Sequence, residues 1–140
     1  MDEKQLIIDI TALIIDIDND LSIEEFEDLS LLCGQNKELE RLILSKITSN
    51  KLLKLSFEDK LLKIKELFNS IDYKDKLLRE DIFKLIIFFI LSDNIIDEKE
   101  KQVLYFFKED YAVFYNKMKL QNPNGEEVFI QLKSFFNKIT

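Results

Sequence analysis

Apolar residues recur at intervals of three or four along most of the chain, which is the spacing of amphipathic helices. The first such segment runs from about Glu3 to Ile17, with Leu6, Ile10 and Leu13 on one face. No stretch alternates apolar and polar residues as a half-buried strand does. The chain has only two glycines and one proline, whereas β-rich folds need many turn residues. The pattern therefore predicts an all-α protein.

Further helices are marked by residues that commonly occur at helix ends. The second helix should end at Gly34, because glycine readily adopts the left-handed conformation of a C-terminal cap. We expect a short third helix that breaks at 48–50, a Thr-Ser-Asn run. N-terminal caps for the third and later helices are predicted at Asn36, Ser56, Asp72 and Asn124. The side chains that the second helix should bury are Phe26, Leu29, Leu32 and Cys33.

The fifth predicted helix, from about 72 to 92, is apolar on every side in its second half, which indicates a place at the centre of the molecule. Another helix should begin near Glu98, and the Asn-Pro-Asn-Gly turn at 122–125 precedes the last. No linker-like stretch divides the 140 residues. We therefore expect residues 1–140 to form a single domain, a bundle of about seven helices.

A short acidic phrase occurs twice in the chain. The segments from Asp20 to Glu27 and from Asp93 to Glu100 both read Asp-x-x-Ile-acid-Glu-x-Glu. Each copy follows an apolar stretch and opens another. This arrangement predicts two related helix–turn–helix units with acidic turns at the molecular surface.

Two interpretations of these acidic turns stay open, and the first is helix capping. Asp97 and Glu100 can satisfy free amides at a helix start, and Ser22 and Glu25 can do so in the first copy. Acids in a first helical turn also interact favourably with the helix dipole. Capping requires no metal ion.

The second interpretation is a site for a divalent cation such as Ca²⁺, which binds about six to eight oxygen atoms. The segment from Asp16 to Glu27 has acids at positions one, three, five, nine and twelve of the calcium-loop template. The sixth position of that template is nearly always glycine, and here it is Leu21. The segment is thus similar to a degenerate EF-hand loop.

The two copies also resemble the Asp-Gly-x-Ile-x-x-x-Glu motif of the TerB-like, tellurite-resistance group of all-helical domains. The matching positions are Asp20, Ile23 and Glu27 in the first copy and Asp93, Ile96 and Glu100 in the second. Leu21 and Asn94 stand where the family has glycine. The resemblance implies a cation-binding or scaffolding module in bacterial stress response or phage defence, with the Asp and Glu of each motif as binding carboxylates. Together with the calcium-loop template, it gives as predicted metal ligands Asp16, Asp18, Asp20, Glu27, Asp93 and Glu100.

Charge is distributed unevenly along the chain. Residues 1–30 carry a net charge of −9 and the remainder a net charge of +2. A local acidic field repels phosphate backbones, which disfavours nucleic-acid binding, and it attracts cations or a basic protein. A second hypothesis is therefore an acidic immunity- or inhibitor-type protein that docks on a basic surface of a toxin or defence effector. The predicted partner-binding residues are Asp16, Asp18, Glu24 and Asp28.

The chain lacks residues that several kinds of chemistry usually require. It has no histidine and no glycine-rich phosphate loop, so we expect a protein that is not an enzyme. The single cysteine, Cys33, excludes an internal disulfide and fits a reducing compartment. The acidic N-terminus does not match a signal peptide, and the longest apolar run, Leu85 to Leu91, is too short for a bilayer. We therefore expect a cytoplasmic protein without membrane insertion; self-association through the Phe-rich C-terminal helix is a third hypothesis.

Overall fold

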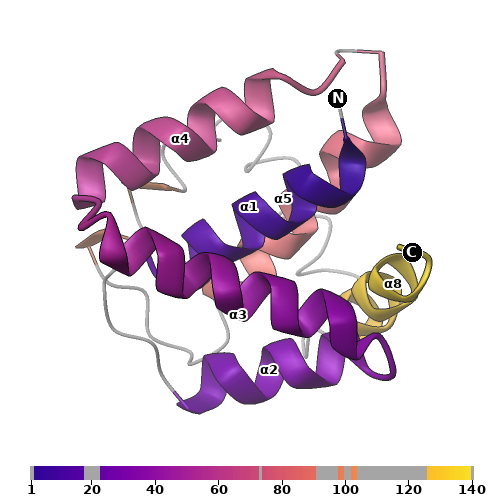
Figure 1. Cartoon of the computed structure of the whole chain (residues 1–140). Coiled ribbons are helices and arrows are strands. Elements are labelled where there is room, and N and C mark those ends of the chain that lie inside the picture. The colour runs from indigo at the N-terminus through magenta and orange to yellow at the C-terminus, as the bar shows by residue number, and fades with distance from the viewer. Residues whose placement is uncertain are drawn as a thin grey trace.

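A computed structural model of the chain describes most of its residues as α-helix (Figure 1). It describes residues 2–17, 23–72, 74–90, 98–99, 102–103 and 126–139, and only the backbone at 24, 90 and 126–129. These residues form six long helices and no strand, which confirms the predicted all-α class. The helices are α1 (Glu3–Ile15), α2 (Ile23–Cys33), α3 (Lys37–Leu52), α4 (Phe57–Asn69), α5 (Lys76–Ile90) and α8 (Glu126–Asn137).

Helix starts are set by side chains that accept backbone hydrogen bonds. Asp2 accepts from the amide of Lys4 at 3.0 Å and so begins α1. Asn36 and Ser56 cap α3 and α4 as predicted, through bonds to the third amide of each helix. The cap predicted for α5 at Asp72 is wrong by three residues, because Asp75 accepts from the Leu78 amide. Asp72 instead accepts from the Lys74 amide, in the turn that leads into the helix.

Helices α1 and α5 form the interior of the described bundle. In Figure 1, α1 lies between α3 and α4, with α5 behind it, and α1 contacts all three. Nine of the thirteen α1 side chains are buried, so this helix has almost no polar face. The α5 positions with a described, buried side chain are Leu78, Ile82, Phe83, Leu85, Ile86, Ile87 and Phe89. The central position predicted for the apolar half of this helix is confirmed.

Helix α3 is longer than the sequence suggested. The break predicted at 48–50 is wrong, since the helix continues to Leu52. Thr48 remains helical by donating its hydroxyl to the Leu44 carbonyl at 3.1 Å, so it does not compete with the main-chain bonds. Asn50 is buried among the helices. Helix α3 is therefore 16 residues long, and it packs against α1.

Helix α8 is hydrogen-bonded to the junction between α2 and α3. The α2 helix ends at Gly34, as predicted, with φ of 56°. The Asn36 amide then donates to the carbonyls of Phe136 and Ile139 at 3.2 and 2.8 Å. One side chain thus caps the start of α3 and satisfies carbonyls at the end of α8. These bonds and the α2–α8 contacts leave the opposite side of α2 facing outward.

Candidate functional site

The end of α1, where the acidic segment begins, is held by a buried ion pair. Asp16 is the C-terminal cap of α1 and is 0% exposed, and Lys60, from α4, is 1% exposed. The Lys60 Nζ lies 2.6 Å from the Asp16 carbonyl oxygen and 3.2 Å from Oδ2. One ammonium group therefore satisfies a free helix carbonyl and neutralises a buried carboxylate.

This geometry corrects the prediction for Asp16. The sequence placed its carboxylate at the surface, as a ligand or a docking residue, whereas the structure buries it against Lys60. Its second oxygen, Oδ1, has no hydrogen-bond partner within the part of the chain that is described. The described contacts thus give Asp16 a structural role in joining α1 to α4.

Sequence reasoning missed Lys60, although a signal for it existed. The buried face of α4 consists of Phe57, Lys60, Ile64 and Phe68, which recur at intervals of three and four. A lysine on the apolar face of a helix is unusual unless it finds a buried anion. The partner, 44 residues earlier in the chain, could not be identified without the fold.

The other predicted ligands are only partly described. Asp18, Asp20, Asp93 and Glu100 lie outside the described residues, and at Glu24 only the backbone is described. Glu27 is exposed on α2, and Asp28 is half-buried and has an interaction of its own. Among the described residues, no three acidic or cysteine side chains gather as a metal ion requires. The calcium prediction stays a prediction.

Helix α2 turns a row of apolar side chains outward. Ile23 is 74% exposed, Phe26 42% and Leu31 57%. Ile23, the exposed Glu27 and Leu31 are four residues apart and share an outward face about two helical turns long, and Phe26 lies at its edge, three residues before the buried Leu29. Phe26 was expected to be buried with Leu29, Leu32 and Cys33, but its side chain is exposed. The outward row is therefore a feature that the sequence pattern did not reveal.

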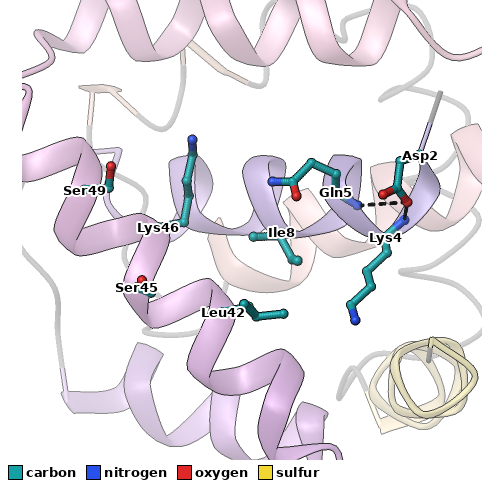
Figure 2. Close-up of a pocket in the computed structure, with 8 residues that line it drawn as sticks. All are labelled: Asp2, Lys4, Gln5, Ile8, Leu42, Ser45, Lys46 and Ser49. Carbon is teal, nitrogen blue, oxygen red and sulfur yellow. Dashed lines mark hydrogen bonds between the residues drawn. The ribbon is translucent and has the colours of Figure 1, made fainter.

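A polar cleft of about 470 Å³ lies between α1 and α3 (Figure 2). It is lined by Asp2, Lys4, Gln5, Ile8, Leu42, Ser45, Lys46 and Ser49. The two lysine side chains point in opposite directions in Figure 2, so they do not converge on one anion. Lys46 also pairs with Asp9 at 3.7 Å, and Asp2 is used as a helix cap. The cleft has mixed charge and no group positioned to act on a ligand.

Within the described part of the chain, burial shifts the pKa of two titratable side chains. Desolvation, and to a smaller extent the nearby Glu40 carboxylate, raises the pKa of the Cys33 thiol to about 12. A thiol with this pKa is almost wholly protonated at neutral pH and is a poor nucleophile. Burial likewise raises the pKa of Asp81 on α5, although Lys84 partly opposes the shift. Cys33 therefore behaves as a small core residue.

Comparison of the chain with protein-family models, curated proteins and solved structures returned no match. Within the described residues, no helix combines the length and the apolar character needed to cross a bilayer. Function has to be inferred from the chain's own charge and exposed side chains.

Proposed function

We propose that this chain is a non-catalytic helical binding domain whose acidic N-terminal portion docks on a basic surface of a protein partner. The observation that carries the proposal is the concentration of charge, a net −9 within residues 1–30. Fields of this kind accelerate association with oppositely charged proteins and exclude partners of like charge. This interaction is of the type made by acidic immunity and inhibitor proteins.

Helix α2 is the described element best suited to present that charge. It carries four acidic residues and no basic residue along eleven positions. Its first described turn follows directly on the segment that joins it to α1, and the helix packs on α8. Because α2 is already helical and packs against α8 and α3, it offers a preorganised surface that loses little conformational entropy on binding.

A protein partner is favoured over a cation by the buried ion pair that Asp16 makes with Lys60. The calcium-loop template uses that residue as its first ligand, but here its Oδ2 and its carbonyl face the Lys60 ammonium. A cation bound there would have to lie close to a buried positive charge. The TerB-like resemblance nevertheless gives the interaction a setting, bacterial stress response or phage defence, that genome neighbourhood can test.

The proposal is tested by neutralising the acidic segment and measuring capture of partners from the source cell. The test variant is Asp18→Asn/Glu24→Gln/Glu27→Gln/Asp28→Asn, which leaves the Asp16–Lys60 pair in place. The control variant removes four exposed acids elsewhere, at Glu38, Glu58, Asp59 and Glu66. Captured proteins are quantified by mass spectrometry, and binding of the purified partner is then measured by calorimetry.

We expect a basic partner that the wild type and the control retain and that the test variant loses. Binding should weaken markedly when salt is raised severalfold from about 0.15 M, because exposed charges are screened. A partner retained equally by both variants, or binding that does not respond to salt, would refute the proposal. Heat released by Ca²⁺ alone, abolished in the same test variant, would support the cation hypothesis instead.

A further inference from the structure

We infer that the partner element recognised at this site is an amphipathic helix. It would lay an apolar row along Ile23, Phe26 and Leu31 of α2 and direct lysines or arginines to the acids of that helix. The inference rests on the proposed function and adds the kind of element that is bound.

The first argument is the grouping of exposed apolar side chains. Each of the helices α3, α4, α5 and α8 exposes one large apolar side chain among those described, whereas α2 exposes three. Single exposed apolar residues are ordinary on protein surfaces, but three within about two turns of one helix favour an interaction site. Glu27 lies between Ile23 and Leu31 on this face. The row thus combines exposed apolar side chains with an acid at its centre.

The second argument concerns the shape of the partner. Addition of a strand requires a free sheet edge, and the described residues contain no strand. Recognition of proline-rich segments requires several aromatic side chains lining a groove, and the row has only Phe26. A helix that places apolar residues three and four apart can instead pack against Ile23 and Phe26, which are three apart on α2, and reach Leu31 about two turns beyond Ile23. Helix-on-helix packing is the mode that this face fits.

The third argument is electrostatic complementarity along the same helix. All four charged side chains of α2 are acidic, and all lie between Glu24 and Asp28, at its N-terminal half. A partner helix with lysine or arginine beside its apolar row would therefore gain attraction at one end, which also fixes its direction. The face spans about 12 Å, so the contact is small and the affinity should be modest.

The experiment uses the full chain and two synthetic peptides of about 18 residues made of leucine and lysine. In one peptide the leucines recur at helical spacing and form a single face. The other has the same composition and charge, but its leucines are distributed around the helix. Binding of each fluorescently labelled peptide is measured by anisotropy at about 0.15 M salt.

The protein variants are matched by exposure. Ile23→Ala/Leu31→Ala removes side chains that are 74% and 57% exposed, and Leu52→Ala/Leu62→Ala removes side chains that are 78% and 55% exposed. Because these side chains are exposed and alanine favours helix, both variants should fold, which circular dichroism verifies. If the α2 variant did not fold, Phe26→Ala alone would replace it.

We expect the wild type to bind the one-faced peptide at least about tenfold more tightly than the distributed one. The affinity of Ile23→Ala/Leu31→Ala for the one-faced peptide should fall by at least about tenfold, and that of Leu52→Ala/Leu62→Ala should change by less than about twofold. One result would overturn the helix inference and leave the proposed function standing: the wild type binds both peptides with equal affinity, and the variant with neutralised acids binds neither. Undiminished binding by the α2 variant, or no binding of either peptide, would also overturn the inference.

Discussion

Replacing Lys60 by methionine should strongly destabilise the protein. Lys60 is 1% exposed, and its Nζ donates to the carbonyl and the Oδ2 of Asp16, which is 0% exposed. Methionine retains most of the buried apolar stem, so the loss of packing is small. The substitution leaves a buried carboxylate without its countercharge and a helix carbonyl without its donor.

The size of the effect follows from this desolvation. Removing one member of a buried ion pair costs about 3–5 kcal/mol, because the remaining charge stays buried and unpaired. Single domains have unfolding free energies of about 5–15 kcal/mol, so the loss is a large part of the total. The midpoint of thermal unfolding should fall by roughly 10–20 °C.

Urea unfolding followed by circular dichroism gives the free energies of unfolding by linear extrapolation. Lys63→Met, an exposed lysine on the same helix, serves as the control and should change stability by less than about 0.5 kcal/mol. The double variant Asp16→Leu/Lys60→Met should recover at least half of the loss, since it removes both charges. A loss below about 1 kcal/mol for Lys60→Met, or additive losses in the double variant, would refute the buried pair.

Three further predictions concern single residues. Cys33, whose thiol pKa is raised to about 12, should not react with a thiol reagent at about pH 8 until urea unfolds the chain; rapid reaction of the folded protein would contradict its burial. Because burial raises the pKa of Asp81, its ionised form disfavours folding at neutral pH, and the cost disappears as pH falls through the folded-state pKa. Asp81→Asn should therefore increase the free energy of unfolding at neutral pH and lose this advantage in acid; a less stable variant at neutral pH would count against the assignment. Lys54 has φ of 53°, so Lys54→Gly should raise the free energy of unfolding by up to about 1 kcal/mol. Lys51→Gly, within α3, should lower it by about as much, and the same change in stability for both variants would contradict the left-handed backbone at Lys54.

Features that depend on near neighbours in sequence could be predicted from the chain alone. The caps at Asn36 and Ser56 and the end of α2 at Gly34 each involve bonds within four residues. The start of α5 could not be fixed in this way, since Asp72 and Asp75 are chemically identical candidates. The choice between them depends on the turn that brings the chain from α4 back to the core.

Features that depend on packing between distant segments escaped sequence reasoning. The burial of Asp16 requires Lys60, and the two are brought together only when α4 packs on α1. The exposure of Phe26 depends on how much of the inner face of α2 is covered by α8 and α3, against which α2 packs. An apolar residue beside a predicted core face does not show by itself which way it will point.

Methyl NMR of the labelled protein, titrated with the one-faced leucine–lysine peptide, tests the central claim most directly because it locates the contact. The account predicts that the Ile23 and Leu31 methyl signals shift progressively, while those of Leu52, Leu53 and Leu77, which are equally exposed, stay in place. Shifts confined to the latter three leucines, or an unchanged spectrum, would contradict the assignment of α2 as the binding surface.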